Sequence, residues 1–266
     1  MRGSAWVVKR SGEREQFDRT KTKAAVMRAG VPDHEAEEVL ERLLPQLYDG
    51  ITTEEIYRRV HQMLEGRKAA KFSLKKAILR LGPEGLNFES FVARLFEAEG
   101  YRTRTRVFVQ GRCVQHEVDV LMERGGESTM VECKFHNSLG LKCSIQSALY
   151  TYARFLDIRN ETGMDRSYLV TNTRFTSDVD SYARCVGMSL LGWRHPEGEG
   201  IEQLAERHQL YPVTILEMRR QDLFSLMSNG FLLVQDILDH EDRARRLLPK
   251  NIVDPLIMQA DGLLAN

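Results

Sequence analysis

The chain has 266 residues, 42% of them hydrophobic and 29% charged, which is typical of an ordinary globular protein. Its 38 basic and 38 acidic side chains cancel, so any contact with nucleic acid has to come from local clusters and not from the overall charge. The sequence contains neither an apolar run approaching the roughly 20 residues of a membrane-spanning helix nor a secretory signal. We therefore expect a cytoplasmic chain that does not contact a membrane.

The first 82 residues predict a small, mainly helical domain that begins with two short strands. Asp18 is a suitable N-cap for the first helix, "RTKTKAAVMRAG". A later helix begins with Thr52 and Glu55, which have the spacing of a capping box. A basic helix from about 67 to 81 is followed by a Gly-Pro segment at 82–85, which is typical of a linker.

Two stretches of this domain, "VVKRSGEREQFDRTKTKAAV" and "YDGITTEEIYRRV", resemble the ATP-cone, a nucleotide-sensing domain of ribonucleotide reductases and of their transcriptional repressors. The resemblance implies that ATP or dATP binds as a regulatory ligand under a β-hairpin lid. It implies contacts at Val8, Lys9, Arg10, Glu15, Asp18, Lys21 and Thr53, with a further contribution from Lys71, Lys75 or Lys76. This sequence departs from the family at Ser11, where Asp is usual, and at Thr22, where an apolar residue is usual.

The basic residues of this set suit a triphosphate on physical grounds as well. Lys9, Arg10 and Lys21 would gather near a helix N-terminus, whose free N–H groups and dipole also favour anions. For each of them alone, a solvated surface residue is the better explanation, so it is the ordered set that favours a nucleotide site.

Residues 83–200 predict a mixed α/β domain. It begins with an amphipathic helix that stops at Gly100, and strands are expected near 101–109, 113–123 and 128–135. A further helix, strand, helix and short strand follow. The remainder, 201–266, is expected to be helical, and its pair of helices at Asn229-Gly230 loosely resembles a helix-hairpin-helix, although a plain packing pair explains it equally well.

The two strands that meet at Gly125-Gly126 carry charges on an element that should be buried. Strand alternation places Asp119 on one face of "HEVDV", and it places Glu132 and Lys134 together on one face of "MVECKF". A hairpin brings these faces side by side, and neighbouring carboxylates repel unless a cation lies between them. Because carboxylate oxygens suit Mg²⁺ or Mn²⁺, the pattern predicts a metal site at Asp119 and Glu132. A surface hairpin with charged outer residues is the alternative interpretation.

The same residues, with "FESFVARLFEAEGY" before them, resemble the PD-(D/E)XK nucleases and among them the Mrr-like restriction endonucleases, over roughly 83–195. In that family the Asp and Glu bind a divalent ion, and the Lys positions or polarises the attacking water. The resemblance therefore implies a catalytic set that consists of Glu89, Asp119, Glu132, Lys134 and Gln146, with Glu89 as an outer acidic ligand.

A stripe of arginines precedes this hairpin in the segment "YRTRTRV". Arg102, Arg104 and Arg106 fall on one face of a strand and could follow the phosphates of DNA beside the proposed site. Arginines on an exposed sheet edge also protect it against unwanted pairing, and this alternative stays open.

The sequence thus predicts an α/β multidomain chain with an ATP-cone at 1–82, a nuclease domain at 83–200 and a helical C-terminal region at 201–266. The expected function is that of an Mg²⁺-dependent endodeoxyribonuclease under adenine-nucleotide control, with DNA and a second copy of the chain as partners. The alternative is a catalytically inactive, nucleotide-responsive DNA-binding or assembly protein. The intact Asp119, Glu132 and Lys134 favour the enzyme. A Gly-x-x-x-x-Gly-Lys-Ser/Thr loop is absent, so the nucleotide is expected to act as a ligand and not as a substrate.

Overall fold

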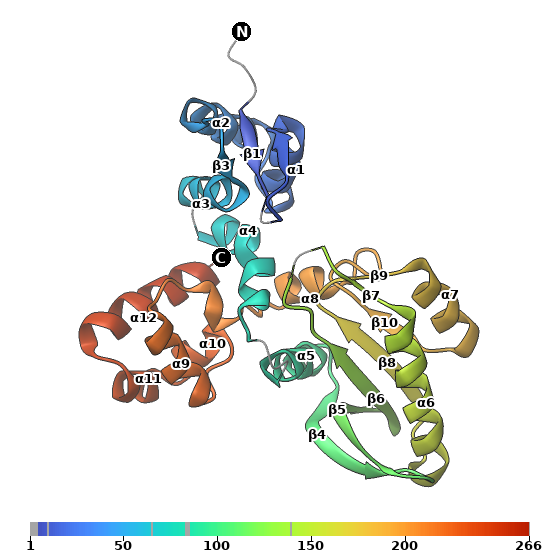
Figure 1. The fold of residues 1–266 in the computed structure, drawn as a ribbon. Coiled ribbons are helices and arrows are strands. Elements are labelled where there is room, and N and C mark those ends of the chain that lie inside the picture. Colours follow the sequence, from blue (N-terminus) through green and yellow to red (C-terminus); the bar gives the residue numbers. More distant parts are fainter. Residues whose placement is uncertain (1–4, 10, 65, 83–85, 139, 266) are drawn as a thin grey trace. The chain divides into compact units, whose positions relative to one another are not determined.

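The computed structural model describes residues 5–9, 11–64, 66–82, 86–138 and 140–265 (Figure 1). It divides the chain into two compact units. Unit 1 contains the residues up to Leu74 together with those from Asp261 onward, and unit 2 runs from Lys75 to Ala260. The mixed α/β fold class that the sequence predicts is confirmed. Among the described residues, none of the helices combines the length and apolarity needed to cross a membrane.

Unit 1 combines a small sheet with a group of helices. Its strands are β1 (Trp6–Val8), β2 (Arg14–Gln16) and β3 (Ile51–Thr52), in the order β2-β1-β3 with β1 and β3 parallel. Its helical elements are α1 (Arg19–Arg28), α2 (Asp33–Leu43), the 3₁₀ turn η1 (Leu44–Gln46), α3 (Thr53–Met63) and the first part of α4 (Gly66–Leu79).

Both helix starts predicted from capping residues are present in unit 1. The Asp18 side chain accepts a hydrogen bond from the Lys21 backbone N–H at 2.9 Å, and the Thr52 hydroxyl accepts one from the Glu55 backbone N–H at 3.1 Å. Each bond satisfies a backbone donor that the first turn of a helix leaves without an intrahelical partner.

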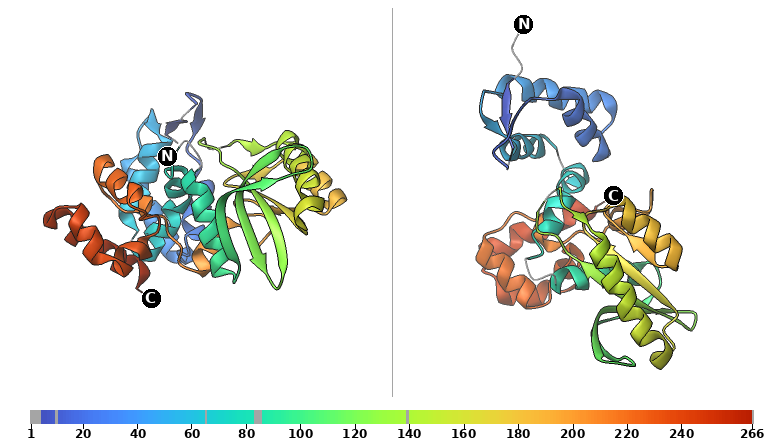
Figure 2. Two further views of the ribbon diagram at one scale, coloured as in Figure 1. Left: turned by 90° about the horizontal axis from the view of Figure 1, so that it is seen from below. Right: turned by 45° about the vertical axis from the view of Figure 1, so that its right-hand side comes forward.

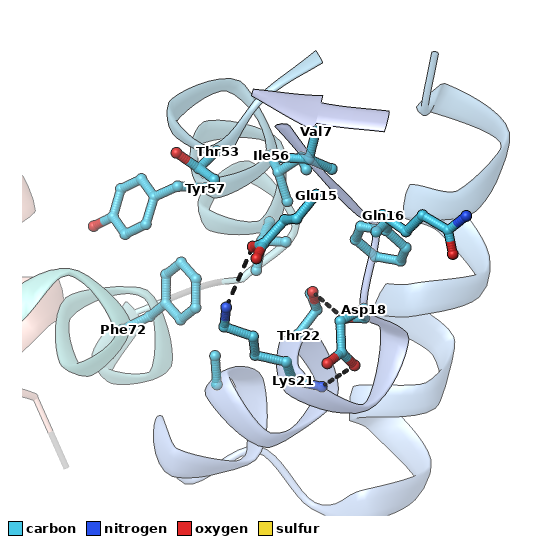
Figure 3. A pocket seen from close by; sticks show the side chains of 13 residues that line it. Val7, Glu15, Gln16, Asp18, Lys21, Thr22, Thr53, Ile56, Tyr57 and Phe72 are labelled. Carbon is cyan, nitrogen blue, oxygen red and sulfur yellow. Dashed lines mark hydrogen bonds and ion pairs between the residues drawn. The ribbon is translucent and has the colours of Figure 1, made fainter. Parts of the chain in front are cut away.

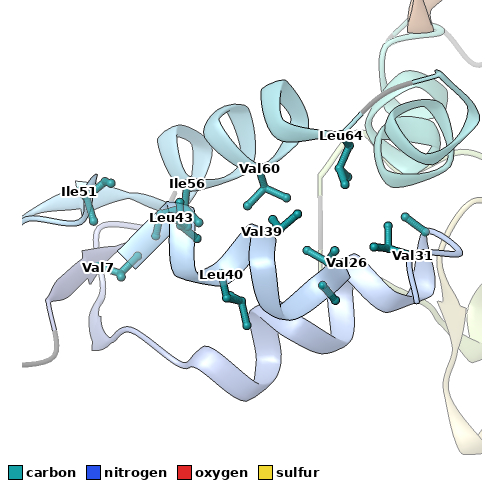
Figure 4. Packing of buried hydrophobic residues seen from close by; sticks show 12 residues of the cluster. Val7, Val26, Val31, Val39, Leu40, Leu43, Ile51, Ile56, Val60 and Leu64 are labelled. Carbon is teal, nitrogen blue, oxygen red and sulfur yellow. The ribbon is translucent and has the colours of Figure 1, made fainter. Parts of the chain in front are cut away.

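The core of unit 1 is formed where α2 packs between its neighbours (Figure 4). The four buried side chains of α2 recur at the spacing of one helix face, and they are Ala36, Val39, Leu40 and Leu43. Val26 of α1 and Val60 of α3 pack in the same cluster. A fully buried side chain of this size contributes about 1.5–3 kcal/mol through the apolar surface that it removes from water.

Unit 2 is built on a five-stranded mixed sheet in the order β10-β8-β6-β5-β4. Its strands are β4 (Arg102–Gln110), β5 (Gln115–Arg124), β6 (Glu127–Lys134), β8 (Arg166–Thr171) and β10 (Ser189–Leu191). The neighbours β4, β5 and β6 are antiparallel, whereas β8 is parallel to both β6 and β10. A separate pair of short parallel strands consists of β7 (Lys142–Cys143) and β9 (Arg174–Phe175).

Helices cover both faces of this sheet, as Figures 1 and 2 show. On one face lies α5 (Leu86–Ala98), and on the other lie α6 (Ile145–Thr162) and α7 (Ser177–Val186). The buried side chains of α5 include Phe88, Phe91 and Leu95, each with no exposed surface. The buried face of α6 packs against strands β5 and β6 through Phe155 and Ile158.

The chain after the sheet is helical, as the sequence predicts. It consists of α8 (Ile201–Arg207), the 3₁₀ turn η2 (Val213–Ile215), α9 (Arg220–Ser228), α10 (Val234–Asp239), α11 (Glu241–Leu247) and α12 (Lys250–Leu264). In the turn between α9 and α10, the Asp236 carboxylate accepts the backbone N–H groups of Leu232 and Leu233 at 2.8 and 2.7 Å. These two amides therefore already have a partner, which weakens the comparison with a helix-hairpin-helix that donates its amides to DNA.

Candidate functional site

The hairpin of β5 and β6 positions the charged residues singled out by the sequence. Its two-residue turn needs positive φ at both positions, and Gly125 and Gly126 provide φ values of 62° and 88°. Cross-strand pairing runs from the turn as far as Val120 and Val131. Asp119 and Glu132 come next on their strands, at the point where the regular pairing ends.

Beyond this point, a hydrogen bond to the Asp119 side chain connects the two strands in place of backbone pairing. The Cys133 N–H donates a hydrogen bond to Asp119 Oδ2 at 2.7 Å. Because this bond holds one carboxylate oxygen, it orients the Asp119 carboxyl group and keeps β5 attached to β6 where their ladder stops. The opening between the two strands is the position of the candidate active site.

Three carboxyl groups influence one another in this opening. Burial and the charge of Asp119 raise the pKa of Glu132 to about 7. Burial and the charge of Asp119 likewise raise the pKa of Glu89, on α5, to about 7, and burial raises the pKa of Asp119 itself. In addition, Oε2 of Glu89 is buried without a hydrogen-bond partner. Carboxyl groups that are crowded and poorly solvated in this way favour the approach of a cation.

The residues fit a divalent ion in their chemistry. The side chains of Asp119 and Glu132 provide only oxygen atoms as ligands. Glu89, whose Oε2 has no hydrogen-bond partner, lies close enough for its charge to raise the pKa of Glu132. Mg²⁺ is commonly held by one or two carboxylates and keeps several waters. Within the described part of the chain, no three His, Cys, Asp or Glu side chains lie close enough together to surround an ion on their own. A full cage of protein ligands is therefore not formed by these residues.

Two cationic side chains face the carboxylates. Lys134 is exposed, and its charge lowers the pKa of both Asp119 and Glu132. Arg154 of α6 was not singled out from the sequence, although its guanidinium Nη1 donates to Glu132 Oε2 and its Nη2 donates to the backbone carbonyl of Glu117. The available signal was the spacing of Gln146, Tyr150 and Arg154, which lie on one face of a helix at intervals of four residues.

Gln146 and the arginine stripe have different surroundings. Gln146 lies exposed in the first turn of α6, and Arg102 is exposed at the start of β4. Arg104 forms an ion pair with Glu123 at 3.2 Å. The charge of Arg106 lowers the pKa of Glu89, so this arginine is the member of the stripe that acts on the carboxyl group.

The backbone at Arg106 is unusual for a strand. Its φ is 52°, in the left-handed region that a non-glycine residue seldom adopts within a strand. Its flanking residues, Thr105 and Val107, pair with Val120 and Val118, so Arg106 lies opposite Asp119. Strain of this kind costs on the order of 1–3 kcal/mol and tends to occur at functional positions.

His116 lies on β5 but takes no part in this arrangement. Its Nε2 lies 2.8 Å from Oδ2 of Asp157, so the imidazole has a hydrogen-bond partner outside the candidate site. Asp157 also accepts the backbone N–H groups of Cys113 and Val114. These bonds fasten the β4–β5 turn to α6, and with His116 they lower the pKa of Asp157 to about 2.

Unit 1 contains a cavity of about 200 Å³ between its sheet and helices (Figure 3). Four of the residues predicted to bind nucleotide line it, namely Glu15, Asp18, Lys21 and Thr53. The sequence missed two aromatic members of the lining, Tyr57 and Phe72, whose rings stack with centroids 5.0 Å apart and planes inclined by 19°. A flat aromatic surface of this kind suits a nucleotide base, because aromatic rings attract one another in offset stacks.

The other predicted nucleotide contacts lie elsewhere. Val8 is the last residue of β1 and Lys9 follows it, and neither of them lines the cavity. Arg10 lies outside the described residues. Lys9 and Lys21 approach opposite oxygens of Glu15, at 2.8 and 3.4 Å. Figure 3 shows Lys21 reaching Glu15 at the centre of the cavity.

Of the further lysines named on α4, Lys75 belongs to unit 2. Its ammonium group lies 5.0 Å from the centre of the Trp193 ring, and burial lowers its pKa. The contribution of Lys71, Lys75 or Lys76 to a nucleotide site stays a prediction.

Two family models match the chain in the same order as these two sites. The ATP cone domain matches residues 6–80, and the restriction endonuclease domain matches residues 83–192. The chain is a fusion of an ATP cone domain and a restriction endonuclease domain. The first carries the cavity of unit 1, and the second carries the opening between β5 and β6.

Three known proteins are similar to parts of this chain, and two of them have no described activity. An uncharacterised protein of Archaeoglobus fulgidus is 44% identical over 157 residues, which is 59% of this chain and 89% of that protein. A crystal structure of a protein of unknown function matches with a TM-score of 0.60 and 41% identity, over 66% of this chain and 96% of the other. The MspJI restriction endonuclease in complex with a 27-mer oligonucleotide gives a TM-score of only 0.34 at 14% identity, over 68% and 45% of the two chains.

Proposed function

We propose that this protein is a metal-dependent endonuclease that hydrolyses phosphodiester bonds in DNA, and that adenine nucleotide bound to its ATP cone regulates it. The observation that carries the proposal is the grouping of Glu89, Asp119 and Glu132 with Lys134 where β5 and β6 part. A structural hairpin has no need for carboxyl groups held in a place that raises their pKa. A hydrolytic site needs them to attract a cation to the reacting phosphate.

Each residue would have a defined role in this reaction. Asp119 and Glu132 would hold Mg²⁺ or Mn²⁺, which when bound lowers the pKa of its water and offsets negative charge on the phosphate. The Cys133 N–H holds Oδ2 of Asp119, which would leave the other carboxylate oxygen available to an ion. Lys134 would orient and polarise the water that attacks phosphorus, and Glu89 would act as an outer acidic ligand. Gln146 would help to position the scissile phosphate.

The arginine stripe would bind the DNA backbone. Arg102 and Arg104 are exposed on β4, and Arg106 extends the same strand to the side of Glu89. Arginine contacts to phosphate release counterions, so binding that depends on them weakens as salt rises. Replacement of Arg102 and Arg106 by Gln should therefore weaken DNA binding and reduce its dependence on salt concentration.

Cleavage of plasmid and single-stranded DNA with Mg²⁺, Mn²⁺ or EDTA tests the nuclease itself. Asp119→Asn, Glu132→Gln and Lys134→Met each remove one proposed function with little change of volume, and we expect each to lower cleavage by at least about 100-fold. The matched control is Glu127→Gln, at the opposite end of β6, where Glu127 forms a surface ion pair with Arg166 at 3.2 Å. Cleavage by folded Glu132→Gln at the rate of the control would overturn the assignment.

One observation favours the second candidate function, that of an inactive nucleotide-responsive DNA-binding or assembly protein. The ion pair between Arg154 and Glu132 engages one of the two proposed metal ligands. The same assay separates the two functions, because DNA binding without cleavage under every metal condition would favour the inactive protein.

The regulatory part of the proposal concerns the cavity of unit 1. Lys21 supplies a positive charge at the start of α1, and Tyr57 with Phe72 supplies a stacked aromatic wall. ATP and dATP combine a base with an anionic tail, and both parts have a counterpart here. Isothermal titration with each nucleotide measures whether the cavity binds them.

A further inference from the structure

Arg154 is a buried cation inside the proposed metal site. It projects from the third turn of α6, only 8% of its surface is exposed, and it bridges the two strands at the place where they part. One end of its guanidinium group donates to Glu132 Oε2 on β6, and the other donates to the Glu117 carbonyl on β5. Its positive charge lowers the pKa of both Asp119 and Glu132.

A divalent ion at Glu132 would have to share that carboxylate with Arg154. The positive charges of the ion and the guanidinium repel one another, and the repulsion is large at a separation of a few ångströms in a site that is poorly screened by water. We propose that Arg154 competes with the divalent ion for Glu132 and so sets the ion affinity of the site. This inference rests on the proposed nuclease function and adds a residue that regulates its metal requirement.

The surroundings of Arg154 allow it to release Glu132 without leaving the protein. Its bond to the Glu117 carbonyl does not involve a metal ligand, and its guanidinium carbon lies 5.3 Å from the centre of the Tyr150 ring. A cation over an aromatic face is stabilised there by the electron density of the ring. While no ion is bound, Arg154 provides the counter-charge for the buried Glu132 carboxylate.

Titration of the chelator-treated, full-length protein with Mn²⁺, followed by electron paramagnetic resonance and calorimetry, tests this competition. The charge is removed at similar volume by Arg154→Met, and Arg154→Lys retains it. We expect Arg154→Met to bind Mn²⁺ at least about tenfold more tightly than wild type, and Arg154→Lys to stay near wild type. The matched control is Arg159→Met on the same helix, since exposed Arg159 lies 5.5 Å from the centre of the Phe155 ring and forms no ion pair with any carboxylate of the described residues.

Thermal unfolding gives an independent reading. Without metal, Arg154→Met leaves a buried carboxylate unpaired, so its midpoint temperature should fall, and Mn²⁺ should raise it by more than in wild type. If Arg154→Met does not fold, Arg154→Gln replaces it, because its amide is uncharged yet can donate to the Glu117 carbonyl; the same tighter binding is expected.

The outcomes separate this inference from the proposed function. Equal or weaker Mn²⁺ binding by the uncharged variants, with cleavage by wild type intact, overturns the role of Arg154 alone. If neither wild type nor the uncharged variants bind Mn²⁺ at millimolar concentrations, the metal-dependent function fails and the inference fails with it. The competition is supported if the uncharged Arg154 variants bind Mn²⁺ more tightly than wild type and Arg159→Met binds it with wild-type affinity.

Discussion

Glu89 shows at the scale of a single residue how the candidate site changes the behaviour of an acid. Its pKa rises from an ordinary value of 4.5 to about 7, first because it is buried and then because Asp119 carries a like charge. The folded protein therefore holds this proton more tightly than the unfolded chain does. Its contribution to stability is complete below pH 4.5 and is lost as the pH rises through 7.

This sign leads to a prediction for Glu89→Gln, whose amide does not ionise. In EDTA, the variant should gain stability relative to wild type between pH 5 and pH 8. Because Glu89 is only half-buried, water screens part of the effect, and we expect a relative gain on the order of 1–2 kcal/mol. Urea unfolding at the two pH values measures it. A stability difference that does not change with pH would show that Glu89 ionises normally.

Single residues also mark where sequence reasoning succeeds and where it stops. Strand alternation placed Asp119 and Glu132 beside one another because both belong to a hairpin with an unambiguous turn. Arg154 was missed because a helical arginine is usually solvated, and only the fold brings it to Glu132. The left-handed backbone of Arg106 was equally hidden, since local preference argues against it and only its place opposite Asp119 makes it notable.

At the scale of elements, Asp18 connects the formation of α1 with the nucleotide cavity. Its carboxylate caps the helix through the Lys21 backbone N–H, and the same side chain lines the cavity. Asn is as good an N-cap as Asp, whereas Ala is not. Asp18→Ala should therefore lower the free energy of unfolding by about 1 kcal/mol, and Asp18→Asn should leave it nearly unchanged.

The Asn variant then separates the two roles of this position. If the charge of Asp18 matters for the ligand, Asp18→Asn should alter ATP affinity although the helix remains capped. Urea unfolding of unit 1 and calorimetric titration with ATP are the two measurements. A loss of stability in Asp18→Asn as large as in Asp18→Ala would contradict the capping role.

Element prediction worked where a physical signal was strong. The hairpin turn was evident from two successive glycines, which have φ values of 62° and 88°. The short strands β7 and β9 were not foreseen, because two residues are too few to show alternation. Their pairing is set by the packing of Cys143 and Phe175 in the core between α6 and α7.

At the scale of the whole molecule, α4 belongs to both compact units. The matched families divide the chain between residues 80 and 83, whereas the contacts divide it after Leu74, inside this helix. The second half of α4 is bound within unit 2, because the Thr214 hydroxyl donates to the Ala77 carbonyl at 2.6 Å and Arg80 donates to the Thr214 carbonyl at 3.0 Å. The first half supplies Phe72 to the cavity of unit 1.

This shared helix gives the nucleotide cavity a covalent connection to unit 2. A ligand can shift an equilibrium only by binding one state better than another, so bound nucleotide must favour one arrangement of a segment that also belongs to unit 2. The helix α4 meets that condition, since ATP or dATP stacked on Phe72 would restrict its first half. We therefore expect either nucleotide to change the rate of DNA cleavage or the oligomeric state, without being hydrolysed.

Two variants separate binding of the nucleotide from transmission of its effect. Lys21→Met, in the cavity, should weaken nucleotide affinity and abolish the change in cleavage. Thr214→Val removes the hydroxyl that holds the second half of α4, so it should leave nucleotide affinity unchanged and reduce the nucleotide effect. Calorimetry, cleavage assays and light scattering with and without nucleotide measure the three quantities. Tight binding of ATP by wild type with identical cleavage and identical mass would contradict regulation, because an occupied cavity that favours neither state shifts nothing.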